Sequence, residues 1–252
     1  MQKVLLNAPF ESLRSYIESL PSRFESEGTY IYGGRRNLIK SFVAPDGTEL
    51  NVKRFHSPKG LNRLVYSLGW RCPKGLRAFR YPSLLLPKGI ETPASVAYIE
   101  SRHAGMLGLS YFVSIQCKYP NLLYEVGQHP ESDYDALARA LGKFTAHMHD
   151  ARVLHLDYSP GNILWTCDED GCYRFSIIDI NRMYFGKVSL RRGADNFRRL
   201  WGSIRFFKTL LTTYAEARGL DVEKTVERGL QTRYRFWKRY SKKYDISFPL
   251  EL

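Results

Sequence analysis

The segment HLDYSPGNILW, residues 155–165, carries the residues that are best suited to chemistry. Asp157 follows His155 by two positions, Asn162 follows Asp157 by five, and the apolar run after Asn162 predicts a strand. A carboxylate on such a loop can accept the proton of an attacking hydroxyl, and an amide oxygen can bind Mg²⁺. The spacing therefore predicts Asp157 as the base and Asn162 as a metal ligand in phosphoryl transfer from ATP.

Three further stretches supply the other groups that this chemistry requires. The apolar segment FSIID ends in Asp179, which is predicted to be the second magnesium ligand. Lys53 lies within the strand-like segment ELNVKRF and is predicted to hold the nucleotide phosphates. Gly33 and Gly34, in YGGRRN, are candidates for a backbone approach to the same phosphates. The joint order and spacing predict a protein-kinase-like fold that uses ATP and Mg²⁺.

Each of these residues also has a simpler interpretation when it is taken alone. The glycine pair is typical of an ordinary hairpin turn. Lys53 could be a solvated lysine on an edge strand, and Asp179 could cap the end of a strand. His155 is interpreted as a structural histidine that ties the loop backbone, not as an acid or base. The specificity of the prediction comes from the combination.

The elements that must position these residues change in character along the chain. Apolar spacing over residues 9–20 predicts a helix, and residues 28–55 predict three short strands with a hairpin turn at Asp46-Gly47. Residues 75–86 predict a short or kinked helix that Pro82 interrupts. Two more strands are predicted in ASVAYIESR and LSYFVSIQC.

The second half reads as mostly helical. DYDALARALGKFTAHMHDARV predicts an amphipathic helix, followed by the loop and by strands at 162–165 and 173–179. From about residue 196 the chain is expected to be helical, with one helix over residues 196–217 and another over residues 222–244. The expected fold class is α+β, a bilobal protein-kinase-like fold with a strand-rich N-lobe over residues 1–120 and a helical C-lobe over residues 121–252.

Composition fits a globular protein in a reducing compartment. The chain has 252 residues, of which 44% are hydrophobic and 25% charged, enough for a core or two modest lobes. The four cysteines form no C-x-x-C pair, which disfavours zinc and favours free thiols. No segment resembles a signal peptide or a membrane span, so a cytoplasmic location is expected, with possible peripheral contact at a membrane surface.

Positive charge is concentrated in the last third. The net charge is +13, and residues 182–252 hold 17 Lys and Arg against 7 Asp and Glu. Such a field attracts phosphate-bearing partners such as nucleic acid, anionic lipid or a phosphorylated glycan. The segment RYRFWKRYSKKY interleaves cations with aromatics, as nucleic-acid surfaces do, but Phe236, Trp237, Tyr240 and Tyr244 recur at helical steps. A helix that packs its aromatics and exposes its charges is the favoured interpretation, so nucleic acid is a disfavoured partner.

The stretches HLDYSPGNIL, IIDINRM, KGIETPASVAYIE and NVKRF resemble the bacterial lipopolysaccharide core kinases, the Kdo and heptose kinase family. The resemblance runs from about residue 30 to residue 215. It implies a bilobal kinase-like fold, ATP and Mg²⁺, and a sugar hydroxyl of the lipid-linked core saccharide as acceptor. By residue, it implies Asp157 as base, Asn162 and Asp179 as metal ligands, and Lys53 on the phosphates.

Two departures from the general kinase pattern leave alternatives open. The metal motif reads Asp-Ile-Asn instead of Asp-Phe-Gly, and residues 75–86 contain no Glu to pair with Lys53, for which Glu91 or Glu100 are possible substitutes. The alternatives to a lipopolysaccharide kinase are a phosphotransferase for a protein or a small-molecule alcohol, and a catalytically weak, nucleotide-binding pseudokinase.

Overall fold

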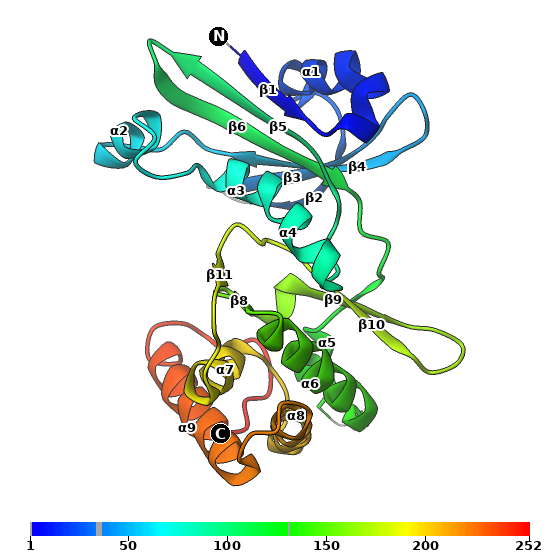
Figure 1. The fold of residues 1–252 in the computed structure, drawn as a ribbon, viewed down its shortest axis with the longest axis vertical. Coiled ribbons are helices and arrows are strands. Elements are labelled where there is room, and N and C mark those ends of the chain that lie inside the picture. The colour runs from blue at the N-terminus through cyan, green and yellow to red at the C-terminus, as the bar shows by residue number, and fades with distance from the viewer. Residues whose placement is uncertain (1, 34–36, 131) are drawn as a thin grey trace. The chain divides into compact units, whose positions relative to one another are not determined.

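The computed structural model describes residues 2–33, 37–130 and 132–252. The chain forms two compact units, Met1–Lys118 and Tyr119–Leu252 (Figure 1). The first unit holds mainly strands and the second mainly helices. No helix in the described part of the chain is long and apolar enough to cross a lipid bilayer.

The first unit is built on a six-stranded antiparallel sheet in the order β1-β5-β6-β4-β3-β2 (Figure 1). Its strands are β1 (Gln2–Leu6), β2 (Thr29–Gly33), β3 (Asn37–Val43), β4 (Glu49–Phe55), β5 (Ser95–His103) and β6 (Met106–Ile115). The predicted turn at Asp46-Gly47 joins β3 to β4. The Thr48 backbone N–H donates to the Asp46 carboxylate over 2.9 Å, and Gly47 takes the left-handed φ of 84° that favours glycine.

Helix α1 (Arg14–Arg23), which follows the 3₁₀ turn η1 (Ala8–Leu13), covers one face of this sheet. Its apolar positions Ile17 and Leu20 are buried with Phe24 against Val52 and Val113 of the sheet, as their helical spacing predicted. These contacts form the hydrophobic core of the unit.

Short helices connect β4 to β5. They are α2 (Leu61–Ser67), α3 (Lys74–Arg80), α4 (Pro82–Leu85) and the 3₁₀ turn η2 (Leu86–Lys88). The predicted interruption at Pro82 is confirmed, because α3 ends at Arg80 and α4 starts at Pro82. A side chain at Gly75 would collide with the Tyr98 ring, so glycine allows α3 to lie directly against β5.

The second unit places its helices around short strand pairs. Its helices are α5 (Glu125–Gln128), α6 (Asp135–Asp150), α7 (Leu190–Asn196), α8 (Ile204–Ala217) and α9 (Val222–Tyr240), with 3₁₀ turns η3 (Pro160–Asn162) and η4 (Phe197–Arg199). Its strands are β7 (Asn121–Leu122), β8 (Val153–His155), β9 (Ile163–Cys167), β10 (Tyr173–Ile177) and β11 (Met183–Phe185), paired as β10-β9-β7 and β11-β8.

The prediction of one continuous helix from residue 196 to residue 217 is wrong. The chain leaves helical geometry after η4 and resumes it only at Ile204, with Ser203 accepting a 3.1 Å hydrogen bond from the Phe206 backbone N–H as the N-cap. Gly202 has a φ of 132°, which interrupts the helix at a position that glycine tolerates. The last helix, α9, ends at Tyr240 instead of continuing to Tyr244.

Candidate active site

His155 fixes the loop that carries Asp157. Its Nδ1 accepts a 3.1 Å hydrogen bond from the Asp157 backbone N–H, and its Nε2 donates to the Ile178 carbonyl over 3.0 Å. The ring is fully buried, and burial lowers the pKa of His155 to about 4, so the imidazole is neutral at physiological pH. His155 thereby holds the loop against the chain just before Asp179, which agrees with its structural interpretation.

Two more hydrogen bonds join Asn162 to the same region. The Asn162 side-chain amide donates to the Asp157 carbonyl over 2.8 Å, and the Ile178 backbone N–H donates to the Asn162 carbonyl over 3.0 Å. Asn162 is thus bonded both to the loop at Asp157 and to Ile178, the residue before Asp179. Its side-chain nitrogen is the donor in the bond to the loop. Its side-chain oxygen is the atom of this amide that can ligate a metal.

Asp179 takes an unusual backbone conformation. It lies two residues after β10 ends, with a left-handed φ of 53°, which Asp adopts more readily than most residues with a side chain. The Asn181 side-chain amide donates to the Asp179 carboxylate. Such backbone positions concentrate at functional sites, where the surrounding structure must hold them.

A buried hydrogen-bond chain supports the loop from the helices of this unit. The Asn196 side chain donates to the His155 carbonyl over 2.9 Å and accepts from His149 Nε2 over 3.2 Å. His149 Nδ1 in turn accepts from the Tyr214 hydroxyl over 2.8 Å. The chain runs from α8 through α6 and α7 to the loop, so the position of Asp157 depends on the helical core.

Because His149 and His155 are buried, we expect the folded protein to lose stability in acid. Burial lowers the pKa of His149 to about 3 and that of His155 to about 4, whereas an unfolded histidine has a pKa near 6.5. Below about pH 6.5, these histidines bind protons in the unfolded chain but not in the folded one. The free energy of unfolding therefore decreases as the pH falls from about 6.5 toward 4. At pH 5 the loss should be on the order of 2 kcal/mol for each histidine.

Urea unfolding at pH 7 and pH 5 checks this expectation. NMR titration should also show two imidazoles that stay neutral down to pH 5 among the six histidines. Equal stability at both pH values, or six histidines that all titrate near pH 6.5, would contradict the buried network.

The sequence did not indicate that arginines surround Asp157. Arg199 of η4 forms an ion pair with one carboxylate oxygen of Asp157, and Arg182 lies 3.6 Å from the other. The Asp157 side chain is about three-quarters buried. No sequence signal identified Arg182 or Arg199, because their contact with Asp157 depends on how distant segments fold together. The two guanidinium groups make the surroundings of the candidate base positive.

In the first unit, Lys53 lies in β4 on the sheet face that α3 covers. Lys53 pairs across the sheet with Phe112, and Phe112 pairs with Tyr98, which contacts α3 at Gly75. Glu100, two residues after Tyr98, therefore lies on the same face, since side chains alternate along a strand. Its buried carboxylate accepts hydrogen bonds of 2.8 Å from the Tyr98 hydroxyl and from Arg102. Glu91 is exposed after η2, so Glu100 is the buried carboxylate on the Lys53 face.

The glycine pair is only partly described. Gly33 ends β2, and a side chain there would collide with the Asn37 carbonyl and the Leu38 backbone of β3. This close approach explains why glycine is needed at Gly33 as part of the hairpin. Gly34 lies outside the described residues.

The side chains fit a magnesium nucleotide. Carboxylate and amide oxygens are the hard ligands that Mg²⁺ prefers, and the second unit holds Asn162 and Asp179 close in the fold through the Ile178 backbone. Groups of three or more His, Cys, Asp or Glu side chains that could hold a metal are absent from the described residues.

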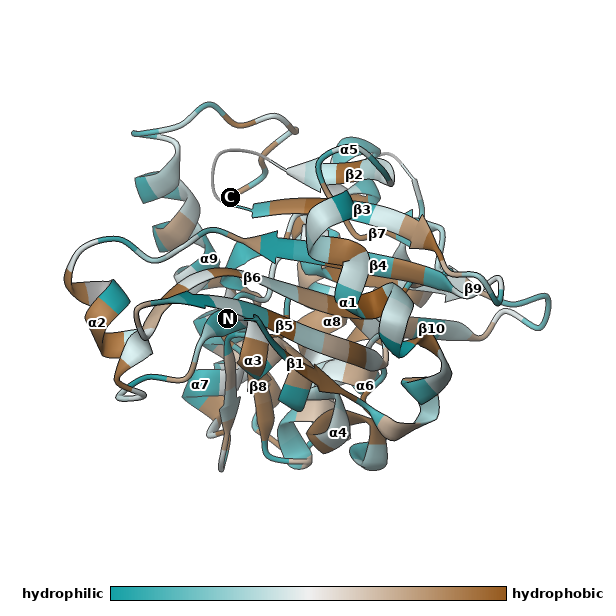
Figure 2. Cartoon of the chain, turned by 90° about the horizontal axis from the view of Figure 1, so that it is seen from above, coloured by the Kyte–Doolittle hydropathy of each residue, from teal (hydrophilic) through white to brown (hydrophobic). Residues whose placement is uncertain are grey.

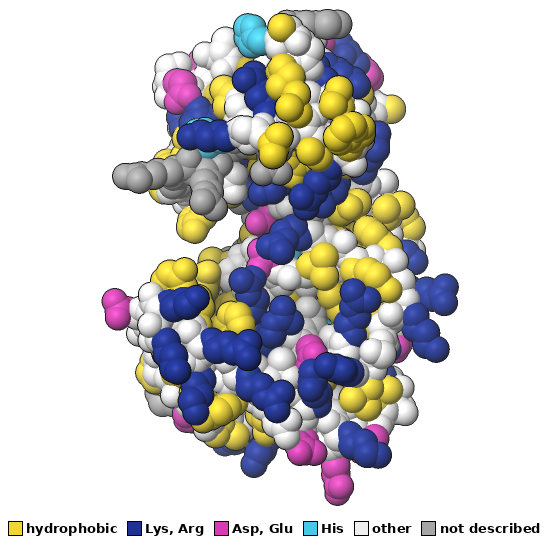
Figure 3. All heavy atoms as spheres, turned by 90° about the vertical axis from the view of Figure 1, so that its left-hand side faces the viewer, with side chains coloured by type: hydrophobic (Ala, Val, Ile, Leu, Met, Phe, Trp, Pro, Cys, Tyr) yellow, Lys and Arg dark blue, Asp and Glu magenta, His cyan; other side chains and the backbone are white. Residues whose placement is uncertain are grey.

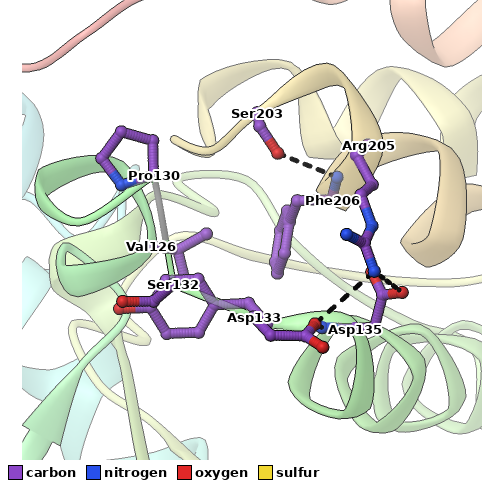
Figure 4. A pocket seen from close by; sticks show the side chains of 9 residues that line it. Val126, Pro130, Ser132, Asp133, Asp135, Ser203, Arg205 and Phe206 are labelled. Atoms are coloured by element: carbon purple, nitrogen blue, oxygen red, sulfur yellow. Dashed lines mark hydrogen bonds and ion pairs between the residues drawn. The ribbon is translucent and has the colours of Figure 1, made fainter.

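The described residues of the second unit line at least two hollows. One, of about 120 Å³, is lined by Asp133, Asp135, Ser203 and Arg205, and Arg205 pairs with Asp135 over 2.6 Å (Figure 4). Its lining includes none of the predicted site residues.

The second hollow is a groove of about 230 Å³ beside the catalytic loop. Ser159 and Pro160 of the loop line it, and so does Arg199, the partner of Asp157. Its other walls are mostly aromatic. They are formed by Tyr124, Trp201, Phe236, Trp237, Tyr240 and Phe248, together with Asp245, Ile246 and Ser247. We call it the aromatic groove.

The α+β fold of the two units and the loop geometry define a protein-kinase-like phosphotransferase. The model of the lipopolysaccharide kinase (Kdo/WaaP) family matches residues 34–218, and the chain belongs to this family. The family resemblance, the fold class and the phosphotransferase activity expected from the sequence are confirmed.

Two solved structures share this fold. WaaP in complex with acyl carrier protein is 17% identical with a TM-score of 0.61, and the match covers 96% of this chain and 100% of that one. The amicoumacin kinase hAmiN, solved in complex with AMP-PNP, Ca²⁺ and Ami, is 11% identical with a TM-score of 0.58 over 95% of this chain and 88% of that one. A comparison with curated protein sequences gives no match.

Proposed function

We propose that this protein transfers the γ-phosphoryl group of Mg²⁺-ATP to a hydroxyl of a Kdo or heptose residue in the lipopolysaccharide core. The observation that carries the proposal is the set of hydrogen bonds by which His155 and Asn162 tie the Asp157 loop to Ile178, the residue before Asp179. The family membership supports the lipopolysaccharide acceptor.

Each residue has a definite role in this proposal. Asp157 accepts the proton of the sugar hydroxyl as it attacks the γ-phosphorus, and Arg182 and Arg199 hold the carboxylate in place. Asn162 and Asp179 would hold Mg²⁺, which neutralises charge on the phosphates, and Lys53 would contact the same phosphates. Glu100 is the candidate for orienting Lys53, because it is the buried carboxylate on that sheet face.

The aromatic groove is the proposed position of the sugar residues next to the reacting one. Aromatic rings cover the apolar face of a sugar, and a few polar groups fix its orientation. The groove also holds the polar side chains of Ser159, Asp245 and Ser247, which can hydrogen-bond sugar hydroxyls. Arg199 adds a positive charge that suits a carboxylate or phosphate on the acceptor.

Arg182 and Arg199 beside Asp157 favour an acidic saccharide over a cationic alcohol such as an aminoglycoside. A panel of acceptors tests the choice: a Kdo-bearing lipid A precursor, a heptose-bearing core oligosaccharide, an aminoglycoside and a generic protein substrate, each incubated with Mg²⁺-ATP. Mass spectrometry should detect one added phosphate on one of the acidic saccharides alone. Phosphate on the aminoglycoside or the protein alone would support the alternative acceptors, and no product with any acceptor would favour a pseudokinase.

We propose that the enzyme is cytoplasmic and makes peripheral contact with the membrane. Exposed cations near the end of the chain, Lys238, Arg239, Lys242 and Lys243, would attract anionic lipid or glycan. We call these four residues the C-terminal basic cluster. Because this attraction is electrostatic, it should weaken as salt shortens the Debye length. Figure 3 shows many Lys and Arg side chains on one face of the second unit.

A further inference from the structure

Helix α2 of the first unit exposes its leucines, while Arg63 and Ser67 are half-buried and Tyr66 is buried. Leu61, Leu64 and Leu68 are 80%, 44% and 59% exposed, and Trp70 just after them is 78% exposed. Leu61, Leu64 and Leu68 follow three- and four-residue steps, so they share one side of the helical segment. We call Leu61, Leu64, Leu68 and Trp70 the α2 apolar face.

The opposite side of α2 is anchored to the sheet by polar groups. Arg63 Nε donates to the Leu107 carbonyl over 3.0 Å, and the Leu107 backbone N–H donates to Ser67 Oγ over 2.8 Å. Tyr66 is buried on this side. These contacts fix the orientation of the helix, so the exposure of the leucines follows from how α2 is held. In Figure 2, brown hydrophobic residues and teal hydrophilic ones both appear along α2.

Such a face costs free energy in water unless something covers it. Soluble proteins expose large apolar side chains mostly as scattered single residues, whereas four large ones here lie within ten residues of sequence. The arrangement is the reverse of a surface helix that packs its apolar stripe into the core. A covering partner must therefore offer an apolar environment.

The charge around α2 indicates which partner that is. Residues 56–90 contain seven Lys and Arg and no Asp or Glu. Lys59, Arg71 and Lys74 are exposed close to the apolar face in sequence. On the first unit, Figure 3 shows hydrophobic side chains beside Lys and Arg. Leucine and tryptophan bordered by cations suit an anionic membrane surface, where the apolar groups enter the acyl boundary and the cations meet the headgroups.

We infer that α2 is a membrane-docking element that inserts Leu61, Leu64, Leu68 and Trp70 into the interface of an anionic bilayer. This contact differs from attraction by the C-terminal basic cluster, because most of its strength comes from apolar burial. Its binding to membranes should therefore persist at salt concentrations that remove a purely electrostatic contact. The inference does not depend on which acceptor the enzyme phosphorylates.

Vesicle co-sedimentation of the full chain tests this inference at low and high salt, with phosphatidylglycerol and phosphatidylethanolamine as the lipids. The variant Leu61→Ser, Leu64→Ser, Leu68→Ser, Trp70→Ser should bind about 100-fold more weakly than wild type at both salt concentrations. The matched control is Tyr32→Ser, Val43→Ser, which removes two exposed apolar side chains of the same unit and should bind like wild type. Circular dichroism confirms that the variants stay folded.

Charge reversal of the C-terminal basic cluster separates the two proposals. That variant should lose binding at low salt only, and its residual high-salt binding should equal that of wild type. Equal binding by wild type and the α2 variant would overturn the inference. The inference would also be overturned if wild type did not bind vesicles and instead bound an acidic protein through α2.

Trp70 provides a second readout. Its indole is far more exposed than Trp165 or Trp201, which are half-buried, and Trp237, which is buried. On adding vesicles, tryptophan emission should shift to shorter wavelength and be quenched by brominated lipid. Trp70→Phe should lose that signal while still binding vesicles within a few-fold of wild type. An unchanged signal in Trp70→Phe would show that Trp70 does not enter the lipid.

Discussion

Replacing Asp157 by Asn should lower phosphoryl-transfer turnover by roughly 10²–10⁴-fold while ATP affinity changes little. Asparagine has nearly the same shape, so it keeps the loop but cannot accept the hydroxyl proton. The loop itself is held by backbone and side-chain bonds of His155 and Asn162 that the substitution leaves in place.

Steady-state kinetics with the saccharide acceptor measures the turnover number. Calorimetric titration with a non-hydrolysable ATP analogue measures the nucleotide affinity. Asp170→Asn, in the exposed turn between β9 and β10, is the matched control and should behave like wild type. Full turnover in Asp157→Asn would remove Asp157 from the mechanism. A parallel loss of nucleotide affinity would make its role structural, as its ion pairs with Arg182 and Arg199 would allow.

Replacing Asp179 by Asn should weaken the binding of Mg²⁺-ATP by about 100-fold or more, because a charged metal ligand is lost. Binding of ATP without a divalent cation should change far less, since the phosphates then have no metal to share with Asp179. Titration of nucleotide in the presence of Mg²⁺ and in the presence of EDTA measures the difference.

Asn181→Ala is the informative companion variant. Its side chain donates to the Asp179 carboxylate, so the variant keeps the ligand and removes the group that positions it. A smaller loss, confined to Mg²⁺-ATP, is expected. If Asp179→Asn weakens the binding of metal-free and magnesium-bound nucleotide alike, the residue holds the left-handed turn instead of a metal.

Local sequence patterns were enough to locate the elements around the candidate site. The Asp46-Gly47 turn, the Pro82 interruption and the amphipathic helix before the loop all depend on residues close in sequence. The interval from Asp157 to Asn162 also predicted a loop that the structure ties together through one side-chain bond.

Features that depend on distant residues were not predicted. Strand β1 was missed because its place is set by pairing with β5, almost a hundred residues away. The contact of Arg199 with Asp157 and the exposure of the α2 leucines likewise follow from tertiary packing. Periodicity shows that a helix has two sides, but packing decides which side faces the protein.

The mass of the lipopolysaccharide core in living cells is a direct test of the proposed acceptor and of the proposed base Asp157. Cells that lack the gene are complemented either with wild type or with Asp157→Asn at matched protein levels, and the isolated core saccharides are compared by mass spectrometry. We expect the core to lose one phosphate in the deletion strain, to regain it with wild type and to stay without it with Asp157→Asn. A core of unchanged mass in all three strains would contradict the proposed acceptor, and a phosphate restored by Asp157→Asn would contradict the proposed base.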